Sequence, residues 1–270
     1  MNSGALAGTV ALITGSSRGI GRQTALLFAE RGATVVLNGR NEAKLAETAE
    51  LLRSRGYSAT SVTADVTNAD QCRAMITRVI AQHGRLDILV NNAGISMRGA
   101  FAQLDPGVIE SVTSTNLLGA ALPTRFAVEA ITEARGSIVF VSSLAGVRGF
   151  AGVSIYSAAK MALTGLAEAL RAELAPSGVH VGVVFVAFTE NDPDKTVMGV
   201  DGAPVRVSRK ASTTQRQVAE EILRTIVRRR RKTYMTAAGK YLVFMQRLFP
   251  RITDAIILRS HGRIHGTSLL

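Results

Sequence analysis

Thr9-Val-Ala-Leu-Ile-Thr-Gly15-Ser-Ser-Arg-Gly19-Ile-Gly21-Arg22-Gln-Thr-Ala-Leu-Leu-Phe-Ala-Glu-Arg31 is the stretch that decides the fold of this chain. Residues 9–14 are apolar and rich in β-formers, which predicts a buried parallel strand. Residues 20–31 repeat apolar side chains at helical spacing. The glycines between them permit a tight turn and let the backbone approach a pyrophosphate at the helix N-terminus. Their spacing is G-x-x-x-G-x-G, and such a loop alone is often only a turn.

Strand-like and helical segments alternate beyond this stretch. The strand-like runs are 34–38, 58–63, 86–90, 136–142 and 179–188, and the helical patterns are 20–31, 42–55, 69–83, 106–133 and 154–175. This alternation predicts an α/β fold in which a doubly wound parallel sheet carries helices on both faces, in a Rossmann-like arrangement. The length suits one domain spanning residues 1–270, and the glycine loop followed by a helix indicates that this domain binds a dinucleotide such as NAD(P).

The end of the strand at 34–38 bears on the choice of dinucleotide. An acidic residue there usually binds the ribose 2′-hydroxyl of NAD, but Gly39 holds this position and Arg40 follows it. Arg18 lies in the glycine loop. Two guanidinium groups near this corner favour a 2′-phosphate, and therefore NADP(H) over NAD(H). The alternative is that both arginines are solvated surface residues.

Tyr156 and Lys160 lie four residues apart, so they share one face of the helix predicted at 154–175. An ammonium beside a phenol favours the phenolate and lowers the tyrosine pKa from its ordinary value of about 10 toward neutral pH. A tyrosine adjusted in this way can donate or accept a proton. Most such pairs in proteins are solvated surface residues, so the spacing alone is weak evidence.

An ordered set of motifs resembles the short-chain dehydrogenase/reductase family in its ordinary-length form. These motifs are Thr14-Gly15-x-x-x-Gly19-Ile20-Gly21, Asp65-Val66, Asn91-Asn92-Ala93-Gly94, Asn116, Ser143 and Tyr156-x-x-x-Lys160. They cover residues 8 to about 192 in the family's order and spacing. Ser143 precedes Tyr156 by the family's usual interval, which favours it over Ser142.

The resemblance implies a sheet of about seven strands in the order 3-2-1-4-5-6-7 and a role for each matching residue. Asp65 and Val66 would contact adenine, the Asn91–Gly94 turn would line the cofactor cleft, and Asn116 would hold a water that links Lys160 to solvent. Asn116 could instead kink its helix by bonding to local carbonyl groups. The implied catalytic residues are Asn116, Ser143, Tyr156 and Lys160. The implied cofactor-binding residues are Gly15, Ser17, Arg18, Gly19, Ile20, Gly21, Arg40, Asp65, Val66, Asn92, Ala93, Gly94, Tyr156, Lys160 and Thr189.

The activity implied by the resemblance is NADP(H)-dependent hydride transfer between a carbonyl group and a secondary alcohol. Ser143 would hydrogen-bond the substrate oxygen, Tyr156 would protonate it, and Lys160 would hold Tyr156 acidic. A second hypothesis is a non-catalytic NADP(H)-binding sensor or scaffold. Such a protein needs the glycine loop but not the Asn116, Ser143, Tyr156 and Lys160 set, so the sequence favours the enzyme.

The chain departs from the family after the strand at 179–188. Val186-Ala187 stands where the family usually has Pro-Gly, and Asn191 stands where a threonine is common. Thr189 or Asn191 could still bond the nicotinamide carboxamide. Residues 188–214 are polar and punctuated by glycine and proline, which predicts a mobile substrate loop.

Positive charge is concentrated near the C-terminus. The chain has a net charge of +12, and residues 201–270 carry 15 Lys and Arg against 4 Asp and Glu. Residues 233–270 form a basic and apolar extension, in which runs such as Tyr241–Met245 alternate with cations. This pattern suits peripheral contact with a membrane, and hence a lipophilic substrate. It equally suits packing on the domain or on a partner subunit. No recognised nucleic-acid module accompanies the basic residues, so we expect no nucleic acid partner.

Composition sets the remaining expectations. Cys72 is the only cysteine and the four histidines form no ligand-spaced cluster, which predicts no internal disulfide and no metal site. We expect no signal peptide and no transmembrane run, and therefore a cytoplasmic protein. The family resemblance implies a homodimer or homotetramer built on the helix at 154–175 and its predecessor.

Overall fold

The computed structural model of the chain describes residues 4–190, 192, 195–206 and 211–264. Its centre is a parallel sheet of seven strands in the order β3-β2-β1-β4-β5-β6-β9. The strands are β1 (Val10–Ile13), β2 (Thr34–Gly39), β3 (Ala59–Thr63), β4 (Ile88–Asn91), β5 (Ser137–Ser143), β6 (His180–Val186) and β9 (Lys232–Tyr234). The predicted fold class and strand order are therefore confirmed, with β9 as the seventh strand.

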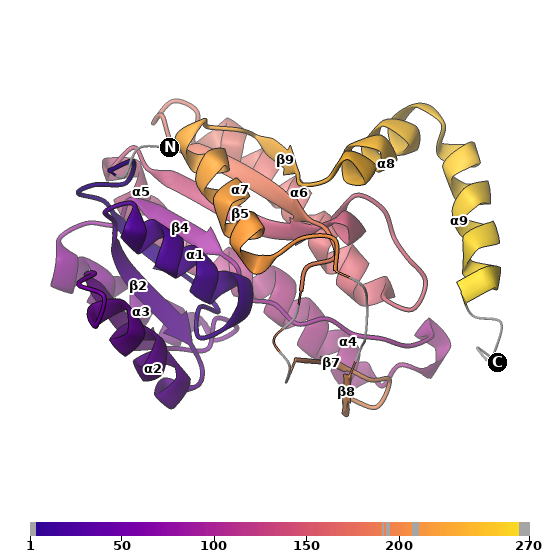
Figure 1. The fold of residues 1–270 in the computed structure, drawn as a ribbon, viewed down its shortest axis with the longest axis horizontal. Helices are drawn as coiled ribbons and strands as arrows, with labels where there is room; N and C mark the ends of the chain where they lie inside the picture. The colour runs from indigo at the N-terminus through magenta and orange to yellow at the C-terminus, as the bar shows by residue number, and fades with distance from the viewer. Residues whose placement is uncertain (1–3, 191, 193–194, 207–210, 265–270) are drawn as a thin grey trace.

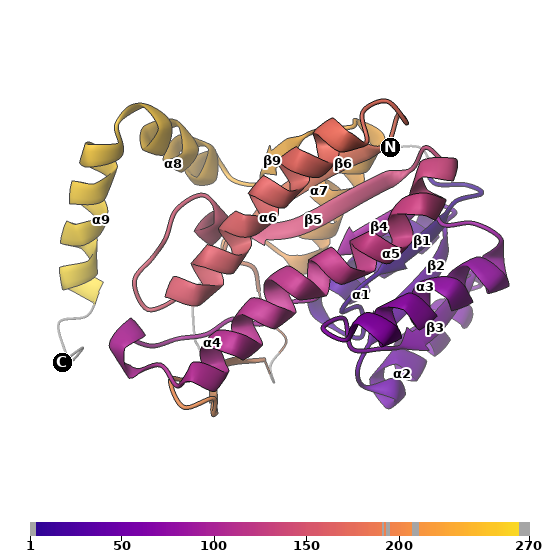
Figure 2. The same cartoon turned by 180° about the vertical axis from the view of Figure 1, so that it is seen from behind.

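Helices cover both faces of this sheet (Figures 1 and 2). The helices of the described chain are α1 (Gly19–Glu30), α2 (Glu42–Arg53), α3 (Ala69–His83), α4 (Pro106–Thr113), α5 (Gly119–Glu133), α6 (Ser154–Glu173), α7 (Gln215–Val227), α8 (Ala237–Leu248) and α9 (Pro250–Ile264). One hydrophobic cluster packs α1, α2 and α7 on the sheet, and a second packs α3, α5 and α6 on the opposite face. Because each face is covered, the central strands β1, β4 and β6 are buried on both sides and their sequences are almost uniformly apolar, whereas the edge strands β3 and β9 contain fewer apolar residues and are partly exposed.

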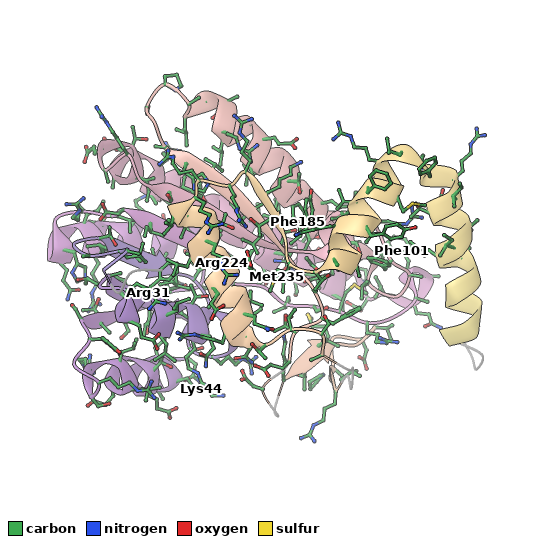
Figure 3. All side chains as sticks on the ribbon, turned by 45° about the horizontal axis from the view of Figure 1, so that its top comes forward. Arg31, Lys44, Phe101, Phe185, Arg224 and Met235 are labelled. Atoms are coloured by element: carbon green, nitrogen blue, oxygen red, sulfur yellow. The ribbon has the colours of Figure 1, made fainter. Side chains whose placement is uncertain are left out.

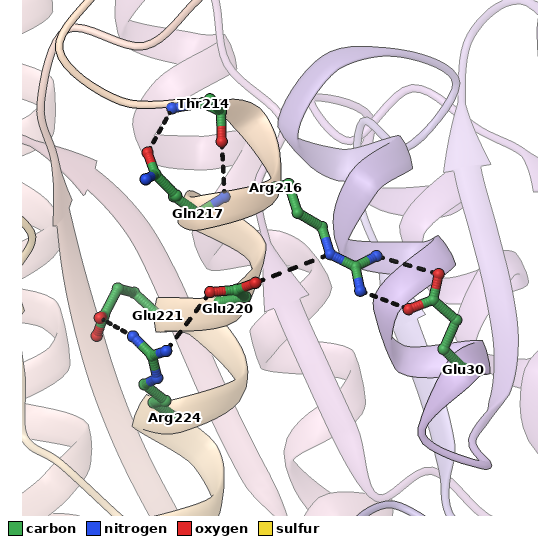
Figure 4. Close-up of polar contacts among 7 residues, drawn as sticks. All are labelled: Glu30, Thr214, Arg216, Gln217, Glu220, Glu221 and Arg224. Atoms are coloured by element: carbon green, nitrogen blue, oxygen red, sulfur yellow. Dashed lines mark hydrogen bonds and ion pairs between the residues drawn. The ribbon is translucent and has the colours of Figure 1, made fainter. Parts of the chain in front are cut away.

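Side-chain caps fix where several helices begin. Asn41 accepts a hydrogen bond from Lys44 N–H at the start of α2, and Asn68 does the same for Gln71 N–H at α3. Thr214 and Gln217 form a reciprocal capping box at α7 (Figure 4). The helix α1 differs, because its N-cap residue Arg18 makes no capping bond with its side chain.

The chain crosses to the other half of the sheet after β3, so β1 pairs with both β2 and β4. Open parallel sheets bind ligands at the carboxyl ends of the strands beside such a reversal. The glycine loop follows β1 and the Asn91–Gly94 turn follows β4, so the topology brings both to this place.

The helix predicted at 106–133 is continuous but not uniform. A π-helical turn, η2 (Ser114–Leu118), joins α4 to α5 and contains Asn116. Short 3₁₀ turns, η1 (Phe101–Gln103) and η3 (Leu144–Gly146), precede α4 and follow β5. A π turn widens the backbone spiral by one residue and is frequent at functional sites.

The C-terminal third differs in two places from the prediction. The stretch predicted as a loop at 188–214 contains a small antiparallel hairpin, β7 (Thr196–Met198) with β8 (Pro204–Arg206). The extension begins after Tyr234 rather than at residue 233, because β9 pairs in parallel with β6 and Tyr234 stacks on Phe185 at 4.6 Å between ring centroids. Beyond it, α8 and α9 project from the body at one end (Figure 1). Among the described helices, none combines the length and apolar character needed to cross a membrane.

Candidate active site

A cleft of about 580 Å³ opens at the carboxyl ends of the strands, at the expected reversal of strand order. Of the described residues that the sequence nominated for the site, it brings together all except Gly21 and Asn91; the Asn91 amide instead donates a hydrogen bond to Thr124 Oγ1 at 2.8 Å. The nominated residues that line it are Gly15, Ser17, Arg18, Gly19, Ile20, Arg40, Asp65, Val66, Asn92, Ala93, Gly94, Asn116, Ser143, Tyr156, Lys160 and Thr189.

The glycine loop forms a backbone cradle at one end of the cleft. Gly15 and Gly19 have φ values of 63° and 59°, which side chains rarely adopt. A Cβ at Gly15 would lie 2.8 Å from Ala93 Cα, and one at Gly21 would lie 2.3 Å from the Gly15 carbonyl oxygen. Gly21 therefore allows the first turn of α1 to pack against the backbone of the glycine loop, and it does not line the cleft. The first N–H groups of α1 carry no side-chain cap and suit a phosphate.

Asn92 and Thr14 join the two loops that form this end of the cleft. Thr14 Oγ1 accepts hydrogen bonds from the N–H groups of Asn92 and Ala93 at 3.0 and 3.1 Å. The Asn92 amide donates in return to the carbonyl groups of Thr14 and Gly15. The Asn92 side chain therefore holds the cradle in shape, while its neighbours Ala93 and Gly94 present backbone to the cleft.

The corner after β2 is rich in cations. Arg40 has a side chain that is 69% exposed, and its guanidinium lies 3.8 Å from the Asp65 carboxylate. Burial tends to raise the pKa of Asp65, but hydrogen bonds from Thr67 and the charge of Arg40 outweigh it and lower that pKa. Arg18 and Lys44 line the same cleft, and both also line a second hollow beside it. Sequence reasoning missed Lys44, because no motif marks the first turn of α2.

Tyr156 and Lys160 face the cleft from the first turns of α6. Lys160 is 5% exposed, and its Nζ donates a hydrogen bond to the Val141 carbonyl oxygen at 3.0 Å. The same nitrogen lies 5.8 Å from the centroid of the Tyr156 ring. Burial lowers the pKa of Lys160 to about 8. The lysine is therefore a buried cation close to the phenol, which a solvated surface pair would not be.

The two serines at the end of β5 have different partners. The Ser142 hydroxyl is buried and donates to the Lys160 carbonyl oxygen at 3.0 Å, so it joins β5 to α6. Ser143 Oγ accepts from Ala145 N–H at 3.2 Å and is only partly buried at the cleft. Ser143 is the better placed of the two to reach a substrate.

Asn116 lies in the π turn with a partly satisfied amide. Its Nδ2 donates to the carbonyl groups of Ile95 and Val112 at 2.7 and 2.8 Å, which is the local bonding expected of a helix-distorting residue. Its buried Oδ1 has no protein partner. A Cβ at Gly94 would lie 2.7 Å from this Oδ1 and 3.3 Å from Lys160 Nζ. Asn116 Oδ1 and Lys160 Nζ therefore both lie beside Gly94, and a side chain at that position would contact both of them.

The segment after β6 closes the cleft on its remaining side. Val186 and Ala187 line the cleft in place of the family's Pro-Gly. The Thr189 hydroxyl bonds to the Ala187 carbonyl oxygen and to Thr213 Oγ1, so it pins the two ends of the 188–214 segment together. Asn191, the other candidate for the carboxamide, lies outside the described residues.

Two acidic residues of this segment were not predicted. Gln215 at the start of α7 donates through its backbone to Glu190 and through its amide to Asp192, at 2.9 and 3.1 Å. The Asp192 carboxylate would lie 3.6 Å from a Cβ at Gly19, close to the start of α1. These contacts join residues 190, 192 and 215 only in three dimensions, so no sequence spacing could have revealed them.

The residues of the cleft fit a nicotinamide dinucleotide. The cradle excludes a Cβ at Gly15, the α1 N-terminus suits a pyrophosphate, and the orphaned Asn116 Oδ1 calls for a donor. Among the described residues, no group of His, Cys, Asp and Glu is arranged to hold a metal ion.

A Rossmann-like sheet with a glycine loop at this cleft is typical of nucleotide-dependent oxidoreductases. The chain belongs to the short-chain dehydrogenase family, whose sequence profile matches residues 9–198. It is 35% identical over 222 residues to the ketoacyl reductase HetN of Nostoc sp., covering 82% of this chain and 76% of that protein.

Solved structures agree with this assignment. A metagenomic short-chain oxidoreductase in complex with NADP is 32% identical, has a TM-score of 0.68, and matches 81% of this chain and 90% of its own. A short-chain dehydrogenase/reductase from Burkholderia phymatum in complex with NAD has a TM-score of 0.81 over 93% of this chain and 96% of its own. At 24% identity, that likeness concerns the fold alone.

Proposed function

We propose that this protein is an NADP(H)-dependent reductase that converts the carbonyl group of a lipophilic substrate to an alcohol, or catalyses the reverse oxidation. The observation that carries the proposal is the meeting of Ser143, Tyr156 and a buried Lys160 in one cleft with the glycine cradle. When bound, the nicotinamide supplies or accepts the hydride.

Each side chain of the set has a task at the substrate oxygen. The Ser143 hydroxyl donates a hydrogen bond that holds this oxygen, and Tyr156 transfers its phenolic proton to it. The Lys160 ammonium stabilises the phenolate that Tyr156 becomes. Asn116 Oδ1, which has no protein partner, is placed to hold a water through which Lys160 exchanges protons with solvent.

The preference for NADP(H) is supported by the corner after β2. Gly39 places no carboxylate where the 2′-hydroxyl of NAD is usually bound, and Arg18, Arg40 and Lys44 gather there. Guanidinium and ammonium groups pair with phosphate by charge and by hydrogen bonds. The structural relatives include complexes with either cofactor, so the argument comes from these residues.

A lipophilic ketone is supported by the apolar part of the cleft lining. Ile95, Met97, Phe188 and Val197 belong to it, and Phe188 is 58% exposed at the surface. Apolar lining around a few polar groups suits a substrate that is mostly hydrocarbon. The similarity to a ketoacyl reductase favours a ketone carried on an acyl chain.

We also propose that the protein is a homo-oligomer. Leu118, the last residue of η2, and Met161 on α6 are 45% and 44% exposed. The family resemblance implies that subunits pair through α6 and the helix before it. Light scattering of the purified full chain measures the subunit number directly.

Replacing Tyr156 with Phe tests the activity. NADPH oxidation is measured with a panel of ketones of increasing chain length. We expect Tyr156→Phe to lower kcat/KM at least about 100-fold while the Kd for NADPH is unchanged, because only the transferable proton is removed. Tyr241→Phe, on the exposed surface of α8, is the matched control and should leave turnover unchanged.

Full activity in Tyr156→Phe would show that another group protonates the substrate. NADPH binding without turnover of any ketone by the unaltered protein would instead favour the sensor or scaffold.

A further inference from the structure

The helices α8 and α9 expose an unusual amount of apolar surface. Half of the large apolar side chains that the described residues expose lie between Tyr241 and Leu258. They are Tyr241, Phe244, Leu248, Phe249, Ile252, Ile256 and Leu258, each 44–72% exposed. A concentration of this kind in one place marks an interaction site.

On α8 the exposed apolar residues lie beside cations. Tyr241, Phe244 and Leu248 are spaced by three and four residues, and Lys240 and Arg247 lie seven residues apart, which is about two turns. With 3.6 residues per turn, these five side chains occupy about a third of the helix circumference. All five are exposed, so the outer face of α8 is both apolar and basic.

The outer face of α9 continues this pattern. Ile252 and Ile256 lie one turn apart and are 52% and 55% exposed, with Arg251 exposed beside them. The ring of Phe249, at the corner between the helices, meets the Phe244 ring edge to face at 6.4 Å. The apolar side chains of the two helices therefore form one surface, which we call the α8–α9 surface.

The opposite side of the pair is fixed to the body by polar contacts. Arg148, just after η3, has a side chain that is only 16% exposed; it forms an ion pair with Asp254 of α9 and a hydrogen bond to Gln246 of α8. Gly239 packs closely on Leu144, where a Cβ would lie 2.8 Å from the leucine side chain. In an ordinary amphipathic helix the large apolar side chains pack on the body; here Leu242, Val243 and Met245 are half-buried, but Tyr241, Phe244 and Leu248 are exposed.

Charge identifies the partner. Asp254 is the only carboxylate in residues 237–264, and Arg148 neutralises it. The outward cations Lys240, Arg247 and Arg251 therefore have no acidic counterpart on this surface. A second copy of the same surface would bring like charges together, whereas an anionic bilayer offers both hydrocarbon and negative head groups. We propose that the α8–α9 surface docks on an anionic membrane surface.

The position of this surface links it to the proposed reaction, on which this part of the inference depends. The strands point their carboxyl ends toward the end of the molecule that carries α8, α9 and η1 (Figure 2). Phe101 of η1 is 62% exposed and lies at that same end (Figure 3). Docking would bring the cleft near the lipid, from which an acyl ketone could enter without crossing water.

Vesicle co-sedimentation of the full chain tests the docking. The probes are vesicles of phosphatidylcholine alone and of phosphatidylcholine with phosphatidylglycerol. We expect binding to the anionic vesicles that weakens as salt is raised. Phe244→Ser with Leu248→Ser, and separately Lys240→Glu with Arg247→Glu, should each lower the partition coefficient at least about tenfold.

Matched control variants make the same kinds of substitution at exposed positions outside the α8–α9 surface. Ile80→Ser with Val227→Ser removes exposed apolar side chains from α3 and α7, and Arg53→Glu with Arg55→Glu reverses exposed charges at the end of α2. Both should bind vesicles as the unaltered protein does. All four variants change exposed positions, and circular dichroism checks that each is folded.

Three results would overturn the docking proposal. These are no binding to either vesicle, equal loss in the control variants, or a concentration-dependent dimer that the α8 variants abolish. The last would mean that a second copy covers the surface. Vesicle binding does not require Tyr156, so Tyr156→Phe separates failure of this inference from failure of the proposed activity.

Discussion

At the scale of single residues, the proposed preference for NADP(H) depends on Arg40. Its guanidinium is mostly exposed and lies near the Asp65 carboxylate, so it is free to turn toward a 2′-phosphate. A hydrogen-bonded charge pair contributes about 1.5–3 kcal/mol, and we take the lower end because of the exposure. Arg40→Ala should therefore raise the Kd for NADPH about tenfold and leave that for NADH unchanged. Fluorescence titration measures both, with Arg53→Ala as the control; equal losses would refute the phosphate role.

Lys160 illustrates the cost of an active-site charge. Burial lowers its pKa from 10.5 to about 8, so below pH 8 the folded state holds a charge that the unfolded state solvates better. The unfolded state binds more protons between these values, so this penalty fades as the pH rises from about 8 to 10.5. The penalty amounts to about 3 kcal/mol at neutral pH. A substitution that removes the ammonium also removes its hydrogen bond to Val141, which offsets about 1 kcal/mol of the gain in stability.

Lys160→Met should consequently raise Tm by a few degrees at pH 7 while abolishing turnover. The gain should vanish between pH 8 and pH 10.5, and at pH 10.5, the ordinary lysine value, the lost hydrogen bond should leave the variant about 1 kcal/mol less stable than the unaltered protein. Calorimetry across this pH range follows the difference. A variant that melts below the unaltered protein at pH 7 would mean that the ammonium stabilises the fold.

At the scale of elements, α1, the helix that follows the glycine loop, contacts α7, the helix that follows the 188–214 segment. Arg216 pairs with Glu30 through two parallel hydrogen bonds, at 3.1 and 2.5 Å, and also approaches Glu220 (Figure 4). The hydrogen bond from Arg216 is the main reason that the pKa of Glu30 is lowered, although burial opposes it. The bidentate geometry makes this pair stronger than an ordinary surface ion pair.

Glu30→Gln should lower the free energy of unfolding by about 1 kcal/mol at pH 7. Because the folded-state pKa is lowered, the pair contributes fully above pH 4.5 and is lost as the pH falls through the lowered value. The difference between variant and unaltered protein should therefore vanish in acid. Urea denaturation at several pH values checks this, with Glu50→Gln, whose partner Arg53 lies within α2, as the control.

Helices and strands whose apolar residues follow a regular spacing could be predicted from the sequence. Elements that are defined by contacts with distant parts of the chain could not. The prediction of 69–83 coincides with α3, because its apolar spacing, the Asn68 cap and Gly84 are all local. The strand β9 has only three residues, and its pairing with β6 defines it. The π turn at Asn116 leaves no mark in the apolar spacing, since α4 and α5 read as one helix.

The same distinction applies to the cleft. Its glycine loop and its Tyr156 and Lys160 pair are local motifs, and the structure brings them to one place. Asp192 and Gln215 meet only because Thr189 and Thr213 join the two ends of a long segment. The burial of Lys160 also depends on β5, where the Val141 carbonyl oxygen accepts a hydrogen bond from its ammonium group.

At the scale of the whole molecule, the cleft and the C-terminal helices are separate in the chain. All residues that line the cleft lie between Gly15 and Gln215, and the sheet is complete at Tyr234. A chain that ends after Thr236 should therefore keep its circular dichroism spectrum and its Kd for NADPH. It loses the contacts of α8 and α9 with Leu144 and Arg148, which we expect to cost about 1–3 kcal/mol and to lower Tm by several degrees.

A chain that ends after Val227 is the informative companion, because it also removes β9. That truncation leaves β6 as an exposed, apolar sheet edge and uncovers Phe185, so it should aggregate rather than merely melt earlier. If the chain ending after Thr236 loses NADPH binding as well, then α8 and α9 shape the cleft through Arg148 and the segment between η3 and α6. If it keeps NADPH binding and turnover of a water-soluble ketone, the extension determines the location of the enzyme and is not needed for the chemistry in the cleft.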